Sequence, residues 1–125
     1  MRTRIATVPL AGLADTGGGV GVWRNPEGVP IIIERVEIDV TTAATGSCTL
    51  DAGTTASSAT TSSDNLIDGL DVNAAAGVFD NIGEKGSNGK SRQKLASGKW
   101  VTFSRASGAS AGLVGRAYIF YHRTA

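Results

Sequence analysis

Short stretches of alternating apolar and polar residues, separated by turns of small residues, most restrict what this chain can fold into. They lie at residues 20–23, 31–40, 48–52, 78–79, 100–104 and 113–122, and each is predicted to form a β-strand. Alternation with a period of two places successive side chains on opposite faces of a strand, and one buried face with one wet face is typical of antiparallel sheets. About seven or eight strands with almost no helix predict an all-β protein, an antiparallel β-sandwich, and favour a jelly roll over an immunoglobulin-like sandwich.

The alternation also predicts which side chains face the core. In the best strand, residues 31–40, the apolar face is expected to hold Ile32, Val36, Ile38 and Val40, and the polar face Ile33, Arg35, Glu37 and Asp39. In residues 113–122 one face holds Leu113, Ala117, Ile119 and Tyr121, and the other Val114, Tyr118 and Phe120. Apolar side chains on both faces predict a central strand that is covered on both sides.

Three segments do not follow the strand pattern. Residues 53–63 are a polar, low-complexity stretch that suits a loop or an edge strand. Leu66, Ile67 and Leu70 are spaced as in a helix, and we expect about one helical turn there, with Asp64 as a possible cap. Residues 80–94 are rich in glycine and positive charge, and are expected to form a mobile, exposed loop.

The N-terminus is expected to lie outside the sandwich. Residues 1–18 include Pro9 and a glycine triplet and lack a sustained period, which predicts an extended N-terminal arm followed by a single domain over residues 19–125. Gly, Ala, Thr and Ser are abundant, so the side chains available for a core are mostly small. Oligomerisation or docking is therefore an expected source of additional stability.

Motifs for catalysis or cofactor binding are weak, and we predict that the protein is not an enzyme and has no cofactor. The single cysteine (Cys48) and single histidine (His122) exclude disulfide frameworks and multi-histidine metal sites. The glycines of residues 17–21 and the sequence NGKS at 88–91 lack the context of nucleotide-binding motifs. A Ca²⁺ site would need acids brought together by a loop, and turn or capping roles explain them more simply: Asp64, Asp68, Asp71 and Asp80.

Membrane and nucleic-acid partners are not expected. No run of 18 apolar residues is present, and the net charge is +1. The charges are nevertheless segregated, because residues 25–80 carry nine acids against Arg35 alone, whereas residues 81–125 carry eight bases against Glu84 alone. Two explanations are open: complementary faces on neighbouring subunits, or strands from the two halves that interleave and pair within one sheet.

Three segments resemble small virion proteins of tailed bacteriophages: ERVEIDVTTAATGSCTLDAG (34–53), DNLIDGLDVNAAAGVFDNIG (64–83) and AGLVGRAYIFYH (111–122). These proteins include capsid decoration (cement) proteins. The resemblance implies a β-sandwich or jelly-roll body, trimeric or otherwise symmetric clustering, and contacts with the major capsid protein lattice through arms and loops. It also implies location in the virion, after assembly in the host cytoplasm.

We therefore expect a decoration protein that holds the head lattice by non-covalent bridging of shell subunits. The arm is expected to anchor the protein, with strand addition to a neighbouring sheet as one mode, and the basic loop is a further candidate. The candidate partner-binding residues are Arg2, Arg4, Ile5, Val8, Leu10, Leu13, Lys85, Lys90 and Arg92. Alternatives are a receptor- or carbohydrate-binding module, for which Trp23 or Trp100 would be exposed, and a minor head or tail subunit.

Overall fold

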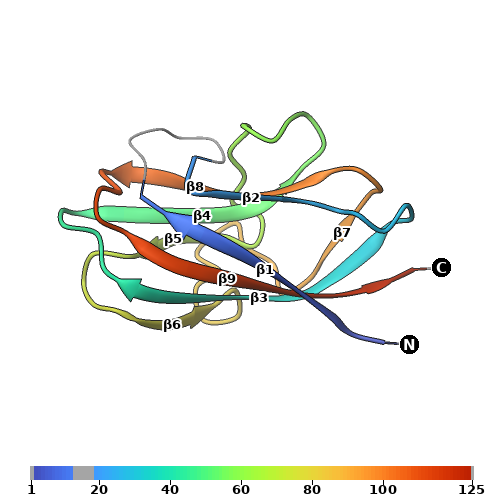
Figure 1. Ribbon diagram of the computed structural model, residues 1–125, viewed down its shortest axis with the longest axis horizontal. Coiled ribbons are helices and arrows are strands. Elements are labelled where there is room, and N and C mark those ends of the chain that lie inside the picture. Colours follow the sequence, from blue (N-terminus) through green and yellow to red (C-terminus); the bar gives the residue numbers. More distant parts are fainter. Residues whose placement is uncertain (1, 13–18, 125) are drawn as a thin grey trace.

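The computed structural model describes residues 2–12 and 19–124, which form two packed antiparallel sheets and contain no helix. The strands are β1 (Arg4–Ala11), β2 (Gly21–Arg24), β3 (Ile31–Thr42), β4 (Cys48–Thr55), β5 (Ile67–Asp71), β6 (Gly77–Asp80), β7 (Gln93–Leu95), β8 (Trp100–Gly108) and β9 (Val114–Arg123). Sheet A has the order β1-β9-β3-β6, with β7 paired to the start of β3, and sheet B has the order β2-β8-β4-β5. Figure 1 shows the two sheets as layers.

The strand order is that of a jelly roll. Outer strands pair across the whole chain (β1 with β9, β2 with β8), and inner strands pair across shorter distances (β3 with β6, β4 with β5). These pairings describe one long antiparallel ribbon that is rolled up, so that β9 also pairs with β3 and β8 with β4. The expectation of a jelly-roll sandwich is confirmed.

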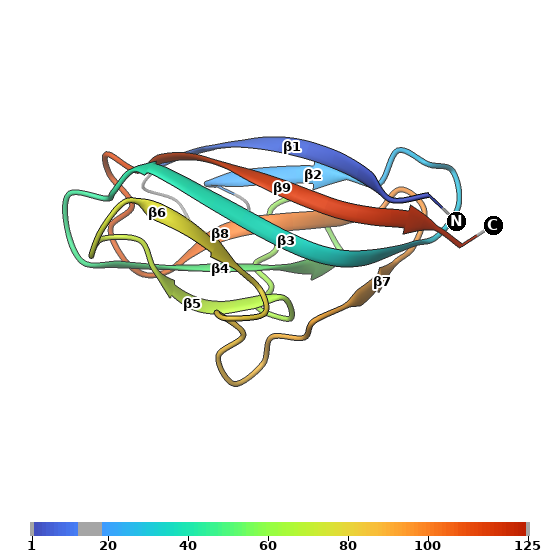
Figure 2. The ribbon, with the colours of Figure 1, turned by 90° about the horizontal axis from the view of Figure 1, so that it is seen from below.

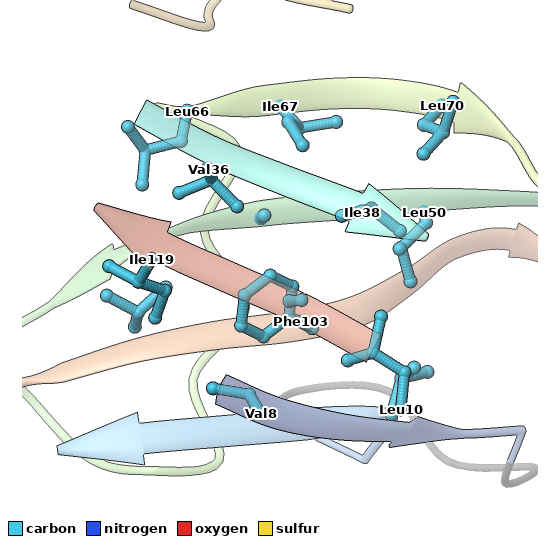
Figure 3. Close-up of a cluster of buried hydrophobic side chains, with 14 of the residues drawn as sticks. Val8, Leu10, Val36, Ile38, Leu50, Leu66, Ile67, Leu70, Phe103 and Ile119 are labelled. Carbon is cyan, nitrogen blue, oxygen red and sulfur yellow. The ribbon is translucent and has the colours of Figure 1, made fainter. Parts of the chain in front are cut away.

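The core lies between the two sheets, and its largest fully buried side chains include Phe103, Leu50, Ile38 and Ile119 (Figure 3). Phe103 comes from β8, and branched aliphatic side chains from both sheets surround it in the close-up. The inward alternation expected for β4 is confirmed, because Cys48, Leu50 and Ala52 are buried. Each buried branched side chain contributes roughly 1.5–3 kcal/mol relative to an exposed one.

The facing of β3 differs from the sequence expectation at the start of the strand. The pairing of β3 with β9 shifts by one residue between Ile33 and Arg35, which marks a β-bulge at Glu34. The extra residue of a bulge interrupts the alternation, so every residue on one side of the bulge faces the opposite way from the one that uninterrupted alternation predicts. Ile33 is therefore buried on the same face as Val36, and Ile32 is only half-buried on the opposite face.

The helical turn expected around residues 64–72 is wrong, because this segment forms β5. The backbone of residue 66 donates to Ala52 O over 3.0 Å, and Leu70 pairs with Leu50 of β4. Leu66, Ile67 and Leu70 are all buried against the core. The open edge of β4 offers more hydrogen bonds and more apolar contact than one isolated helical turn, so tertiary pairing overrides local spacing.

The two charge-segregated halves of the chain interleave, as one of the two explanations predicted. The acidic strand β3 lies beside the C-terminal strand β9, with Asp39 opposite Arg116. Glu34 contacts His122 at 2.9 Å, and Glu27 contacts Arg123 at 3.6 Å. Much of the charge asymmetry along the sequence is therefore compensated within one sandwich.

Candidate partner-binding surface

The segment expected to be a free arm is largely part of the sandwich. Residues 4–11 form β1, which pairs with β9 along its full length, from Arg4 opposite Tyr121 to Ala11 opposite Val114. Val8 and Leu10 are each only 3% exposed and belong to the core, so they cannot contact a partner in this fold. The alternate apolar residues Val8 and Leu10 are the sequence signal for this strand, but Pro9 between them is typical of a loop or a strand edge. Leu13 lies outside the described residues.

The free edge of β1 is poorly suited to strand addition. Ala11 N donates to Val20 O over 3.2 Å, which shows that this N–H points away from β9. With a period of two, the nitrogen of Pro9 faces the same way, and proline has no hydrogen to donate. Proline at this position removes one of the free N–H donors through which an edge strand can pair with a strand of another chain. Strand addition at β1, expected as one anchoring mode, would have donors only near Ile5 and Thr7.

One end of the sandwich is fixed by polar contacts around Glu27, in the turn after β2. Its carboxylate accepts a hydrogen bond from Tyr121 Oη at 2.8 Å. It also forms an ion pair with Arg4, whose Nη1 lies 2.8 Å away. The hydrogen bond from Tyr121, together with Arg4, lowers the pKa of Glu27, whereas burial and this same contact raise the pKa of Tyr121. Arg4, a candidate partner-binding residue, therefore already has an internal partner, although its side chain is 42% exposed.

The outer face of sheet A is an open surface with several apolar side chains. Figure 2 shows β1, β9, β3 and β6 running side by side across it. Three of its side chains are at least half exposed: Ile5 at 59%, Val78 at 62% and Val114 at 50%. Tyr118 and Phe120 of β9 lie on the same face and are half-buried. The expectation that β9 is central and apolar on both faces is confirmed, but within the described chain no element covers its outer face.

The outer face of sheet B is different, because residues 56–65 fold over part of it. Thr102 Oγ1 donates to Thr61 O at 2.8 Å, and Asn65 Nδ2 donates to Thr54 Oγ1 at 2.8 Å. A side chain on Gly53 would collide with Asn65, which shows how closely this segment approaches. Two hydroxyl side chains of β8, Thr102 and Ser104, are completely buried, and Thr102 is the one that contacts this segment.

A hollow on the outer face of sheet A brings together segments that are distant in the sequence. It is lined by Thr3, Glu34, Arg35, Arg92 and Phe120 and has a volume of about 350 Å³. The guanidinium of Arg35 lies 4.8 Å from the centre of the Phe120 ring, a cation–π contact. Ile5 is the cross-strand neighbour of Phe120, so it stands beside the hollow.

The carboxylate of Glu34 in this hollow already has hydrogen-bond partners within the chain. Glu34 accepts hydrogen bonds from Thr3 Oγ1 at 3.0 Å and lies 2.9 Å from His122 Nδ1. The hydrogen bond from His122, followed by that from Thr3 and the charge of Arg92, lowers the pKa of Glu34. The hollow as a whole therefore presents side chains of both signs, Glu34, Arg35 and Arg92, around the Phe120 ring.

The basic loop is anchored by one buried side chain, Asn81. Its Nδ2 donates to Lys90 O at 2.8 Å and to Ser91 O at 3.1 Å, and its Oδ1 accepts from Val36 N at 2.9 Å. These bonds attach the loop to β3 just after the bulge and place Arg92 beside Glu34. The sequence pattern predicts a mobile, exposed loop here, and it gives no sign of the anchoring by Asn81 or of strand β7. Lys90 and Arg92 are exposed as expected, and Lys85 is half-buried.

A group of carboxylates lies at the β5 side of sheet B. Oxygens of Asp51, Asp64 and Asp68 lie within 4.8 Å of one another, whereas Asp71 and Asp80 are not part of the group. Asp51 accepts from Gly69 N, Asp64 from Asn88 Nδ2, and Asp68 from the backbone of residues 87 and 88. Burial, and then the charges of Asp68 and Asp64, raise the pKa of Asp51. These contacts attach the basic loop to β4 and β5.

Neither tryptophan forms an open stacking platform. Trp23 packs against the core, with its ring 5.1 Å from that of Tyr121. Trp100 is half-buried and is flanked by Arg24 and Lys99, whose charged groups lie 5.6 Å and 6.0 Å from its ring. In the described ranges, no helix is long and apolar enough to cross a membrane.

Comparison with solved structures finds this fold in bacteriophage capsids. A chain in the capsid of Ralstonia phage GP4 superposes with a TM-score of 0.64 and 21% identity, covering 99% of this chain and 86% of that chain. A chain in the acid-stable capsid of Helicobacter pylori bacteriophage KHP30 gives a TM-score of 0.57 and 13% identity, covering 95% and 86%. No protein-family model and no curated sequence matches. The class defined by fold and surface is thus a jelly-roll sandwich of a kind present in phage capsids.

Proposed function

We propose that this protein is a structural component of a bacteriophage virion, and that it acts as a decoration, or cement, protein on the head. The observation that carries the proposal is the fold, which nearly the whole chain shares with chains of two phage capsids. The sequence resemblance to small virion proteins points independently to the same class. A non-enzymatic role agrees with the hollow on the outer face of sheet A, which is open to solvent rather than enclosed.

The mechanism is non-covalent bridging of the major capsid protein lattice. Each copy would contact two or more shell subunits, and many weak contacts along a regular lattice add up through multivalency. The basic residues that have no core role are the candidates for the shell contact: Arg2 and Lys90, which are exposed, and Lys85, which is half-buried. Copies of the chain would cluster symmetrically at lattice junctions, and a trimer is the form that the resemblance implies.

The test is binding of the purified full chain to heads assembled from the major capsid protein of the same phage. We expect it to cosediment with the heads, to occupy regular positions in a reconstruction, and to delay rupture of the heads on heating. A variant carrying Lys85→Ala and Lys90→Ala should bind more weakly, whereas Lys99→Ala, beside Trp100, serves as a control that also removes a positive charge. Density confined to the tail, or no binding to heads, would contradict the proposal.

The alternative of a receptor- or carbohydrate-binding module rests on Trp100, which keeps part of its ring exposed between two cations. Sugars stack on exposed aromatic rings, but the flanking cations already occupy this one. A glycan array with the full chain separates the alternatives: a hit that Trp100→Ala removes would favour carbohydrate binding, and an array without hits would favour the structural role.

A further inference from the structure

Strand β6 forms an edge of sheet A, at the lower margin of the molecule in Figure 1. An edge strand presents unpaired N–H and C=O groups to other chains, and native proteins protect such edges with proline, charged side chains or covering loops. β1 carries Pro9, β2 ends at the exposed Arg24, and β7 includes the exposed Lys94. A loop covers β5, because Asp68 N donates to Glu84 O over 3.2 Å. Of the edge strands that the structure describes, β6 is the one that remains.

The edge formed by β6 is apolar and lacks free charge. The segment VNAAAGVF, residues 72–79, contains no charged residue, and Val78 is 62% exposed. The carboxylate of Asp80 is turned back toward the following turn, where it accepts hydrogen bonds from Ile82 N at 3.0 Å and Gly83 N at 2.8 Å. This edge therefore lacks the charged side chains with which native edges avoid pairing with their own copies.

The backbone of Val78 points to the open side of β6. Asn81 N donates to Val36 O over 3.1 Å, so the N–H of the residue that follows β6 faces β3. Because backbone groups alternate along a strand, the N–H groups of Val78 and Asp80 face away from β3. Within the described residues, no hydrogen bond from a loop or turn reaches the N or O atom of Val78. Val78 thus offers one donor and one acceptor to another chain.

We propose that β6 pairs antiparallel with β6 of a second copy of the chain, around a two-fold axis at Val78. In this pair, Val78 N of each copy donates to Val78 O of the other, as in a hydrogen-bonded pair of an antiparallel sheet. The two exposed valine side chains become cross-strand neighbours and are removed from water. The strands of sheet A and their symmetry copies then form one continuous sheet across both molecules.

The pattern of donors and acceptors on this edge is complementary to itself, which favours a second copy as the partner. Pairing at residue 78 places Asp80 of one copy opposite Ala76 of the other, so Asp80 N finds a second backbone acceptor. Ala76 is exposed and therefore accessible to such a contact. Every contact occurs twice in a two-fold pair, and the pair is closed because it uses the same edge of both copies. The edge is short, so we expect a weak pair that is reinforced when many copies lie on one particle.

The pairing adds a contact between copies to the proposed function, and it can be tested without any phage particle. Sedimentation equilibrium of the full chain up to about 1 mM should show the wild type reaching the mass of a dimer. Val78→Pro removes the donor at the centre of the pair, but it leaves the pairing of β6 with β3 because this N–H faces away from β3. We expect this variant to dissociate at least about ten times more readily than the wild type.

Val22→Pro is the matched control, because Val22 is 42% exposed and lies on β2, an edge strand of sheet B. Asn25 N donates to Lys99 O over 2.8 Å, so by the same alternation Val22 N faces away from β8. This variant introduces the same substitution at another exposed edge and should dimerise like the wild type. Circular dichroism of both proline variants verifies folding.

Charged substitutions at residue 78 test the two-fold register. In homodimers of Val78→Lys or of Val78→Glu, like charges would oppose each other, so each variant alone should dissociate more readily than the wild type. In a mixture, the lysine introduced on one copy faces the glutamate introduced on the other, and dimers should reappear. Amide hydrogen exchange gives a direct readout in the wild type, because exchange at Val78 N should slow as the protein concentration rises, whereas exchange at Val22 N should not.

A wild type that remains monomeric, a Val78→Pro variant that dimerises normally, or a mixture that fails to dimerise would each overturn the pairing. A monomeric wild type whose binding to heads is lost in Val78→Pro would assign this edge to a shell subunit instead. Loss of dimers in Val78→Pro with retained binding to heads supports both proposals. Dimers of the wild type without binding to heads contradict only the virion role.

Discussion

At the scale of single residues, the covered face of sheet B contains two buried hydroxyls that differ in their hydrogen bonding. Thr102 Oγ1 donates to Thr61 O, whereas Ser104 Oγ has no hydrogen-bond partner among the described residues. A buried polar group without a partner costs about 1–3 kcal/mol, and a satisfied one contributes about 1 kcal/mol net. These neighbours on β8 therefore offer a matched comparison.

We predict that Ser104→Ala raises the free energy of unfolding by up to about 1 kcal/mol, because the substitution removes an unsatisfied oxygen and keeps the strand. Thr102→Val should lower it by about 1 kcal/mol, because Thr61 O loses its donor. Denaturant titration with unchanged m-values measures both effects. A destabilised Ser104→Ala would show that the hydroxyl has a partner in solution.

The carboxylate of Asp51 gives a prediction about pH. Its pKa is raised, so the folded protein binds this proton at a higher pH than the unfolded chain does, and ionised Asp51 costs stability near neutral pH. Asp51→Asn can keep the hydrogen bond from Gly69 N and should stabilise the fold at pH 7 by less than about 1 kcal/mol, since solvent screens these charges. The gain should shrink as the pH falls through the raised pKa toward 3.8.

Thermal unfolding from pH 7 to pH 4 measures this difference. Asp39→Asn is the control, because its carboxylate faces Arg116 across the strands rather than two other acids. A stability difference between Asp51→Asn and the wild type that grows on acidification would contradict the assignment of the cost to burial and charge repulsion.

At the scale of elements, β1 is an integral strand of the sandwich, whereas the sequence predicts a free arm at these residues. Its inward residues Val8 and Leu10 cover the core, and its outward residue Ile5 is exposed. The partner of β1 is β9, which follows it by more than a hundred residues. A pattern read along the chain cannot show that partner, so a strand interrupted by proline resembled a loop.

We predict that Leu10→Ala costs about 2–4 kcal/mol, because it leaves a cavity at the edge of the core. Ile5→Ala on the same strand should cost less than about 0.5 kcal/mol, since its side chain is 59% exposed. Removal of residues 1–11 should therefore unfold the body rather than only release it from a partner. Chemical denaturation checks this result, and a truncated chain as stable as the full one would show that β1 is dispensable.

At the scale of the whole molecule, the rolled ribbon joins the two ends of the chain. Arg4 lies opposite Tyr121, and β2 pairs with β8 from Gly21 opposite Phe103 to Arg24 opposite Trp100. Such pairs require closure of very long loops before any hydrogen bond forms. The interleaving also places acidic and basic halves side by side, which keeps the fold compact and leaves only local patches of charge.

We predict slow folding, from milliseconds to seconds, because most pairings of this topology are distant in sequence. Tryptophan fluorescence after rapid dilution from denaturant reports on it, since Trp23 packs on Tyr121 only when β2 and β9 are both in place. Folding within microseconds would indicate that the long-range pairs are not rate-limiting.

The sequence by itself determined the fold class, the positions of most strands and the inward faces of β4 and β9, because a period of two is a local property of the chain. It also indicated the basic loop and the small core. Only the tertiary structure decided the facing of Ile33, the strand at residues 67–71, the inclusion of β1 and the anchoring role of Asn81. Each depends on a bulge, an open edge or a buried hydrogen bond supplied by residues far away in the chain, and no local pattern records such a partner.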